Sequence, residues 1–381
     1  MPAPAGTRAV PSDPPDPSYP LSMSASTLTI ASIPGDGIGT EVIPVGRRLA
    51  ERAADACGIG LRWADFDWSC ERYVDSGRMM PPDGMERLAD HDAIYLGAVG
   101  WPSVPDHVSL WQLLIPIRRE MDQYANVRPV RLMPGIASPL AGRAVGDIDF
   151  VVVRENVEGE YSEIGGRMYA GTDQEQVSQL TVMTRRGVDR IMDYAFELAA
   201  TRERRKVTSA TKSNGIMHTM PFWDERFRAA AARHPGIETD QYHIDILTAH
   251  FVAHPEWFDV VVGSNLFGDI LSDLGPAVAG SIGIAPSANI DPSGRHPSMF
   301  EPVHGSAPDI AGRGVANPIA AVWTAAMMLG HLGAGEAETL LMRAIESALV
   351  DPAARTRDLG GTATTAECER VLLASLDAAA R

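Results

Sequence analysis

The chain has 381 residues, of which 45 % are hydrophobic and 22 % are charged, as is usual for a globular protein. It carries 33 Lys and Arg against 49 Asp and Glu, and the resulting net charge of −16 argues against nucleic acid or an anionic membrane as a partner. Cys57, Cys70 and Cys368 are odd in number and widely spaced. We therefore expect neither a disulfide framework nor a thiolate metal site, and we expect a reducing, cytoplasmic compartment. No apolar run approaches the roughly 18 residues of a membrane span.

The first 26 residues differ from the rest of the chain, since proline recurs among them without any periodic apolar pattern. They also lack the apolar segment of a secretory signal. Residues 1–26 are therefore predicted to form a disordered extension, or to precede a true start near Met23.

From residue 27 onward, short apolar runs alternate with amphipathic segments. A strand at Thr27–Ile33 ends at Pro34, and a helix at Glu41–Cys57 is closed by Gly58. Further strands are expected at Leu61–Phe66, Ala93–Leu96, Val127–Leu132, Phe150–Val153, Gln179–Met183, Lys206–Ala210, Gln241–Ile244 and Val260–Val262. Helices are expected at Gly84–Ala89, Leu110–Gln123, Arg186–Thr201, Met217–Arg233, Ile246–Ala253, Leu266–Ala279, Pro318–Leu332, Glu336–Leu349 and Thr365–Ala379. This alternation favours an α/β protein with a largely parallel sheet.

A glycine-rich segment, GDGIGT, lies between the first strand and the first helix. It departs from the dinucleotide fingerprint G-x-G-x-x-G because Thr40 takes the place of the last glycine. An acidic residue about twenty positions further on, Asp55, falls inside the helix and not at a strand end. We therefore interpret the segment as a strand-to-helix turn that can still line a cofactor site.

Arginines stand out in a chain this acidic. Arg118 lies in an amphipathic segment, while Arg128 and Arg154 lie near strand ends. The guanidinium fork binds a carboxylate through two hydrogen bonds, so several forks together can hold a diacid. The alternative is that each is a solvated surface arginine.

Asp269 and Asp273 are spaced i, i+4 in the segment NLFGDILSDL, so both project from one helix face. Two like charges at this spacing destabilise a bare helix, and carboxylate oxygens suit Mg²⁺ or Mn²⁺. The helix dipole alone explains Asp269 but not Asp273, which lies a turn further in.

Two further segments contain candidate functional groups. Lys212 follows the strand Lys206–Ala210, at the end where open α/β sheets bind ligands, and a buried lysine can act as a base. The loop EPVHGSAPDIAG contains His304 and Asp309, and a carboxylate there can accept hydrogen bonds from a ribose diol. The alternatives are a solvated lysine and an ordered surface turn.

Together these motifs resemble the β-decarboxylating dehydrogenase family of isocitrate and isopropylmalate dehydrogenases, from about Leu28 to the C-terminus. The resemblance implies a large mixed sheet flanked by helices, which is not a Rossmann fold. It implies a large cofactor-binding domain made of residues 27–125 and 275–381. A smaller domain, residues 126–274, would build the interface of a homodimer with a shared active site.

The resemblance also implies roles for individual residues. Tyr161 corresponds to the general acid and Lys212 to the general base, while Asp245, Asp269 and Asp273 correspond to the ligands of Mn²⁺ or Mg²⁺. The partner subunit would supply the lysine and Asp245. The substrate-binding positions are Arg118, Arg128, Arg154 and Leu114, and those for NAD are His304, Gly305, Ser306, Ala307, Asp309, Ile310, Asn317 and Asn265. Asp309-Ile310 stands where enzymes that use NADP carry Lys and Tyr.

Within the family, the segment GWPSVPDHVSLWQLLIPIRR decides the substrate. Gln112 and Leu114 replace the Ser and Asn of isocitrate enzymes, and Trp111 replaces an acidic residue typical of isopropylmalate enzymes. The segment resembles the tartrate and D-malate branch, which is associated with Mn²⁺ and a monovalent cation such as K⁺. We therefore predict metal- and NAD-dependent oxidation of a small 2-hydroxy diacid, with or without β-decarboxylation. The alternatives are a 3-isopropylmalate dehydrogenase and a non-catalytic regulatory subunit.

Overall fold

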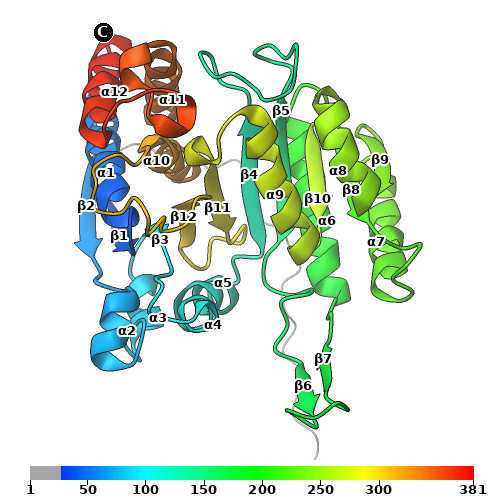
Figure 1. Ribbon diagram of the computed structural model, residues 1–381. Helices are drawn as coiled ribbons and strands as arrows, with labels where there is room; N and C mark the ends of the chain where they lie inside the picture. The colour runs from blue at the N-terminus through cyan, green and yellow to red at the C-terminus, as the bar shows by residue number, and fades with distance from the viewer. Residues whose placement is uncertain (1–26) are drawn as a thin grey trace, which may run out of the picture.

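The computed structural model describes residues 27–381, so the predicted disordered extension lies outside the described residues. One ten-stranded sheet runs through the molecule in the order β2-β1-β3-β12-β11-β4-β5-β10-β8-β9 (Figure 1). Its strands are β1 (Thr27–Gly35), β2 (Gly60–Asp65), β3 (Ala93–Ala98), β4 (Ala125–Arg131), β5 (Asp149–Glu155), β8 (Lys206–Thr211), β9 (Glu238–His243), β10 (Val260–Gly263), β11 (Pro286–Ile290) and β12 (Ser298–Pro302). A separate hairpin, β6 (Gly165–Met168) and β7 (Gln176–Gln179), projects from the body as an arm.

Helices cover both faces of the sheet. They are α1 (Gly39–Ala56), α2 (Cys70–Ser76), α3 (Gly84–Ala89), α4 (Asp106–Ser109), α5 (Ile115–Glu120), α6 (Arg185–Thr201), α7 (Thr219–Arg233), α8 (Ile244–Ala253), α9 (Asn265–Ala279), α10 (Ile319–His331), α11 (Gly335–Val350) and α12 (Thr365–Ala379). In Figure 1, α9 lies in front of β5 and β10 and α6 lies behind them, and both helices contact these strands. No helix within residues 27–381 has the length and apolar character needed to cross a bilayer.

The sheet is mixed, as the family resemblance implies, and is less parallel than the alternation of elements suggests. Six strand pairings are parallel and three are antiparallel, and the antiparallel ones join β12, β11, β4 and β5. The reason lies in the connections, because β4 runs to β5 and β11 runs to β12 without an intervening helix. Parallel pairing needs a long crossover, whereas antiparallel strands can be joined by a short return.

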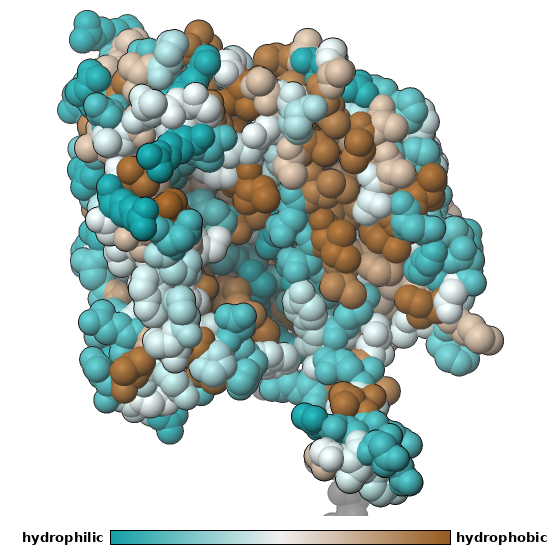
Figure 2. All heavy atoms as spheres, in the orientation of Figure 1, coloured by the Kyte–Doolittle hydropathy of each residue, from teal (hydrophilic) through white to brown (hydrophobic). Residues whose placement is uncertain are grey.

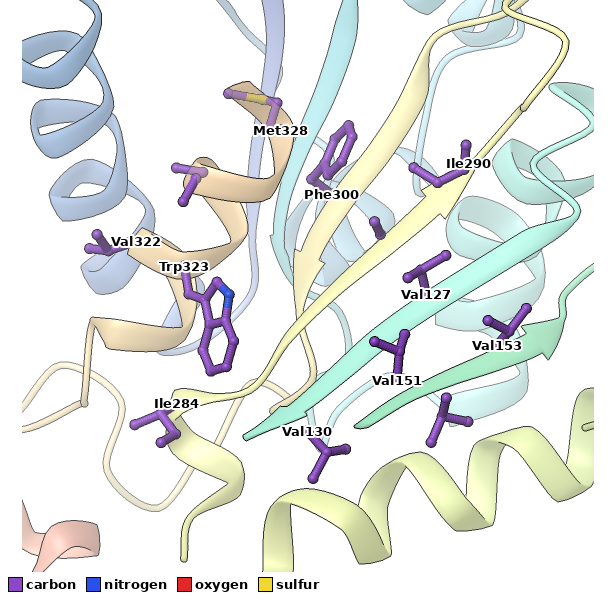
Figure 3. Close-up of a cluster of buried hydrophobic side chains, with 14 of the residues drawn as sticks. Val127, Val130, Val151, Val153, Ile284, Ile290, Phe300, Val322, Trp323 and Met328 are labelled. Carbon is purple, nitrogen blue, oxygen red and sulfur yellow. The ribbon is translucent and has the colours of Figure 1, made fainter. Parts of the chain in front are cut away.

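The core at the centre of the molecule is built on α10, which is buried along nearly its whole length. Trp323 and Met328 on this helix lie beside Phe300 of β12 and Ile284 in Figure 3. A helix that is apolar on every side can be stable only inside such a core. This packing joins the C-terminal helices to the strands that carry the site.

Most predicted elements are confirmed, and three predictions are wrong in part. The strand expected at Gln179–Met183 is instead β7, which ends at Gln179, and beyond it Val182 makes only an isolated bridge to Gly159. Ile244 begins α8 and does not end a strand, because extended backbone at His243 starts the helix there. The strands β6, β11 and β12 and the helix α2 are absent from the prediction.

The helix expected at Leu110–Gln123 is the third correction, because the segment is interrupted. The helical stretch starts earlier, with α4 at Asp106–Ser109, continues through a π-helical turn at Leu110–Leu114, and ends with α5 at Glu120. Pro116 lacks the backbone N–H that a regular helix would use at this point. The chain therefore bulges outward by one residue beside the predicted substrate-binding positions.

Candidate active site

The polar face of the central antiparallel strands forms the floor of the candidate site. Asn126 of β4 pairs with Arg154 of β5 on one side and with Asn289 of β11 on the other. Directly paired residues project from the same face of a sheet. Arg128 lies two residues along β4 and therefore shares that face, so neighbouring strands place Arg128 and Arg154 together.

These two arginines meet the aspartates of α9. The Arg154 guanidinium forms an ion pair with Asp269, and Arg128 Nη1 lies 3.8 Å from Asp269 and 3.5 Å from Asp273. Asn265, at the start of the same helix, accepts hydrogen bonds from Arg154 Nε at 3.0 Å and Nη2 at 2.6 Å. The i, i+4 aspartates thus face the positive charge that their spacing requires.

The charges of the arginines keep Asp269 ionised. Burial opposes ionisation of Asp269, but the guanidiniums of Arg154 and Arg128 outweigh it and hold the pKa of Asp269 below its ordinary value. Burial lowers the pKa of Arg154 to about 10, against the attraction of Asp269, so the guanidinium stays charged at neutral pH. Burial raises the pKa of Asp273, which lies near Arg128, while Arg154 pairs with Asp269 instead.

Arg118 reaches the site from α5 and pairs with an acid that the sequence analysis did not assign. Its Nη2 donates to Glu301 Oε1 at 2.6 Å, and Asn289 Nδ2 donates to the same oxygen at 2.8 Å. Arg118 Nε and Arg128 Nε are buried and have no hydrogen-bond partner among residues 27–381. Buried donors of this kind normally find an acceptor, and a bound carboxylate can provide one.

Tyr161 lies in the loop between β5 and the arm. Its hydroxyl donates to Asp269 Oδ2 at 2.8 Å, and the Arg154 guanidinium lies 5.4 Å from the centroid of its ring. Burial, followed by the negative charge of Asp269, raises the pKa of Tyr161, so the hydroxyl keeps its proton at neutral pH. Tyr161 therefore joins the cluster to which sequence reasoning assigns it.

Lys212 and Asp245 form a separate pair. Lys212 Nζ lies 2.7 Å from Asp245 Oδ1, and the two side chains are 30 % and 67 % exposed. Within residues 27–381, no hydrogen bond or ion pair joins either residue to the arginine cluster. Nor does any group of three or more His, Cys, Asp or Glu side chains in this part of the chain lie close enough together to hold a metal ion. One chain thus presents two incomplete halves of the predicted set.

The donor set nonetheless fits a hard divalent cation. Asp269 and Asp273 offer carboxylate oxygens from one helix face, which suit Mg²⁺ and Mn²⁺ better than softer metals. The Asp273 side chain is 62 % exposed and has Arg128 Nη1 at 3.5 Å from one oxygen, so its carboxylate remains accessible to a ligand. Asp245 is likewise open, because among residues 27–381 its carboxylate pairs only with Lys212.

The glycine-rich segment is a strand-to-helix turn and borders a cleft of about 570 Å³. The cleft is lined by Gly35, Asp36, Gly37, Thr40, Ser69, Glu71, Val74, Trp101, Ser103, Ala311 and Gly312. A Cβ on Gly37 would lie 2.0 Å from the backbone oxygen of Ser306, so glycine lets the turn approach the 304–312 loop. A second cleft, of about 520 Å³, shares Trp101 and includes Gly305 and Ser306.

The 304–312 loop is held by the first helix. The backbone N–H groups of Gly312 and Gly314 donate to the Glu41 carboxylate at 2.5 Å and 3.0 Å, and Ile38 N donates to Ser306 O at 2.9 Å. His304 Nε2 is buried and has no hydrogen-bond partner in the described part of the chain, and burial lowers the pKa of this histidine.

The remaining predicted cofactor residues differ in their surroundings. Ser306 is buried, Gly305 and Asp309 are exposed, and Ala307 and Ile310 are partly buried. Asn317 is used structurally, since it accepts from Ile319 N and donates to Asp358. Asn265 lies apart from this loop and contacts Arg154.

Several residues of the site escaped sequence reasoning. Glu301 begins the EPVHG motif, but nothing in that motif shows that its carboxylate meets an arginine 183 positions away. Ser272 accepts a hydrogen bond from Arg128 Nη1 at 2.8 Å and is a common residue on a helix. Leu114, predicted to contact substrate, is partly buried in the π-helical turn.

Residues 29–373 match the family model described as isocitrate/isopropylmalate dehydrogenase, and the chain belongs to this family. It is 58 % identical to the D-malate dehydrogenase [decarboxylating] of Escherichia coli, over 89 % of this chain and 96 % of the relative. It is also 58 % identical to the tartrate dehydrogenase/decarboxylase of Pseudomonas putida, over 90 % of this chain and 96 % of the relative.

Among solved structures, the fold is similar to that of isocitrate dehydrogenase from Methylococcus capsulatus. The TM-score is 0.81 at 32 % sequence identity, and the match covers 92 % of this chain and 99 % of the other. The predicted family and fold class are thereby confirmed.

Proposed function

We propose that the chain is a metal- and NAD-dependent dehydrogenase that oxidises a small 2-hydroxy diacid, tartrate or D-malate. The observation that carries this proposal is the convergence of three arginines, two helix aspartates and a tyrosine on one polar face. Curated relatives at 58 % identity bear the names tartrate dehydrogenase/decarboxylase and D-malate dehydrogenase. These relatives favour this branch over the 3-isopropylmalate and regulatory-subunit alternatives.

The three guanidiniums bind and orient the substrate. Arg118 and Arg128 each have a buried Nε that no acceptor within the described residues contacts, and the carboxylates of a diacid can provide acceptors. Two guanidiniums can bind the two carboxylates of a short diacid, which fixes the position of its reacting carbon relative to the catalytic residues. Glu301 and Asn265 hold the outer arginines in place through the contacts described above.

Proton transfers are assigned to two residues. Lys212 takes the proton of the substrate hydroxyl. NAD, when bound, would supply the acceptor for the hydride from the carbon that bears this hydroxyl. After a β-carboxylate departs as CO₂, Tyr161 donates a proton to the carbon that bore this carboxylate. The Tyr161 hydroxyl already lies in the cluster, where it donates a hydrogen bond to Asp269. With tartrate the reaction can end after oxidation, whereas with D-malate it runs to pyruvate.

Asp269 and Asp273, with Asp245 of a second subunit, would hold Mn²⁺ or Mg²⁺. A divalent cation there supplies electrostatic stabilisation of the negative charge that develops on the substrate oxygen. We retain K⁺ as an additional activator, and no residue is assigned to it.

NAD is assigned to the two clefts around Trp101. Gly35 to Thr40 and the 304–312 loop line them, and the exposed Asp309 carboxylate is available to a ribose diol. We propose His304, Gly305, Ser306, Ala307, Asp309, Ile310 and Asn317 as the adenosine-binding set. Asn265 lies apart from the 304–312 loop, and we propose that it contacts NAD from the side of the arginine cluster.

A homodimer completes the site in this proposal. Apolar side chains gather on the surface over α8 and α9 in Figure 2, where Ile246, Val252 and Ile270 are 44 %, 45 % and 45 % exposed. The arm exposes further apolar residues, including Tyr169 and Val177. In this proposal, residues 27–125 and 275–381 form one domain and residues 126–274 form the other. A subunit interface built from residues 126–274 would cover these apolar surfaces and bring Lys212 and Asp245 to the arginine cluster of the partner subunit.

An NADH absorbance assay tests the proposal. L-tartrate, meso-tartrate, D-malate, 3-isopropylmalate and isocitrate are compared with Mn²⁺ and K⁺, each with and without EDTA. We expect EDTA-sensitive NADH formation with tartrate or D-malate. Activity confined to 3-isopropylmalate would overturn the substrate assignment, and silence on all five would favour the regulatory subunit.

A further inference from the structure

Arg119, the second arginine of α5, has no role in the function proposed above. Its Nη2 donates a hydrogen bond to the backbone carbonyl of Tyr161, and its Nη1 lies 3.5 Å from Glu163 Oε2. Its guanidinium also lies 4.8 Å from the centroid of the Trp111 ring. Arg119 therefore links the substrate-specificity segment to the loop that carries the proposed general acid.

The π-helical turn explains how Trp111 comes to lie against Arg119. Trp111 and Arg119 are eight residues apart in the sequence. In a regular α-helix, that separation is about 2.2 turns, which places the two side chains roughly 80° from each other around the axis. The π turn at Leu110–Leu114 accommodates one extra residue. With that residue absorbed, the rotation from Trp111 to Arg119 is close to two full turns. The two side chains therefore lie on the same face of the helix.

The loop that carries Tyr161 is partly buried, and Glu160 anchors it to the start of α9 by accepting hydrogen bonds from Ser264 Oγ at 2.7 Å and Leu266 N at 3.0 Å. It continues into the arm, whose β6 and β7 residues are all exposed. Two contacts hold the tyrosine side chain, namely its hydrogen bond to Asp269 and the Arg154 guanidinium near its ring. Arg119 adds a contact to the backbone of the same residue, and it comes from a different part of the fold, α5.

We infer that Arg119, stacked on Trp111, is a positioning residue that sets the place of the Tyr161 hydroxyl, and this inference rests on the proposed function. Neither Arg119 nor Trp111 has to touch the substrate. A shift of the hydroxyl by about 1 Å can slow a reaction by on the order of a hundredfold. The step most affected is protonation of the substrate carbon after CO₂ is lost, which oxidation alone does not require.

Steady-state kinetics of the full chain with Mn²⁺ and D-malate test this inference. Arg119→Met should lower kcat by on the order of tenfold to a hundredfold while KM changes less than about threefold, because the three clamp arginines remain. Arg119→Lys, which keeps a cation and a donor, should recover part of the loss. Arg185→Met, an exposed arginine of α6 that pairs with Asp189, is the matched control and should behave as the unchanged protein.

A second set of variants separates the two proposals. If Tyr161→Phe retains full turnover of D-malate, the acid role proposed for Tyr161 fails. If Tyr161→Phe loses turnover but Arg119→Met does not, the positioning inference alone is overturned. Trp111→Leu should lower kcat less than Arg119→Met does, and the double variant should match Arg119→Met, because both changes break one link. Additive losses would show that the two residues act independently, and would refute the stacked pair.

Discussion

Glu155 provides a quantitative test of the electrostatics beneath the site. It ends β5 beside Arg154 and is 2 % exposed. Its Oε2 accepts hydrogen bonds from the backbone N–H groups of Val157 at 3.1 Å and Glu158 at 2.8 Å. Burial, reinforced by the Glu158 carboxylate and opposed by those N–H groups and Arg190, raises the pKa of Glu155 from 4.5 to about 8. The carboxyl is therefore neutral in the folded protein at pH 7.

A raised pKa makes this group a source of pH-dependent stability. The folded state holds the proton more tightly than the unfolded state, so the stabilisation is complete below about pH 4.5 and is lost as the pH rises through about 8. At roughly 1.4 kcal/mol for each pKa unit, about 3 kcal/mol of the free energy of unfolding is lost between pH 4.5 and pH 7. Glu155→Gln is neutral at every pH and does not suffer this loss.

Urea unfolding at pH 5, 6, 7 and 8, at one fixed protein concentration, measures the difference. The variant should gain roughly 3 to 4 kcal/mol relative to the unchanged protein between pH 5 and pH 8. Glu225→Gln, which removes a 65 % exposed carboxylate, should run parallel to the unchanged protein. Parallel curves for Glu155→Gln as well would refute the assignment of a neutral, buried carboxyl.

Three further predictions concern the proposed site. Lys212→Met should lower kcat by at least about a hundredfold while size-exclusion chromatography still shows a folded dimer, and retained turnover would refute the base role. Asp273→Asn should raise the Mn²⁺ concentration for half-maximal activity by more than about tenfold, and an unchanged Mn²⁺ titration would remove Asp273 from the metal set. Gly37→Ala should lower the free energy of unfolding by roughly 1 to 2 kcal/mol and raise the KM for NAD, because φ is 55° at Gly37 and a Cβ would meet Ser306. An unchanged free energy of unfolding and an unchanged KM would exclude a close approach of this turn to Ser306.

Much of the fold could be predicted because it depends on local patterns. Apolar spacing identifies α9 and α12, and Gly58, at φ 72°, ends α1 as expected. The i, i+4 spacing of Asp269 and Asp273 places both acids on one helix face whatever the rest of the chain does. The order of the motifs is sufficient to identify the family, which the comparison confirms.

The sequence by itself therefore determined most of the elements, the family and the residue types that can bind a diacid and a metal. Tertiary structure alone decided which distant groups meet. Arg118 of α5 finds Glu301 of β12, and Arg154 of β5 finds Asn265 of α9, only when these remote elements come together. Tertiary structure also decided the antiparallel centre of the sheet and the π turn that aligns Trp111 with Arg119, because strand partners and helix register depend on contacts between remote segments. For the same reason, Lys212 and Asp245 stand apart from Asp269 within one chain, and a second subunit is needed to join them in the proposed site.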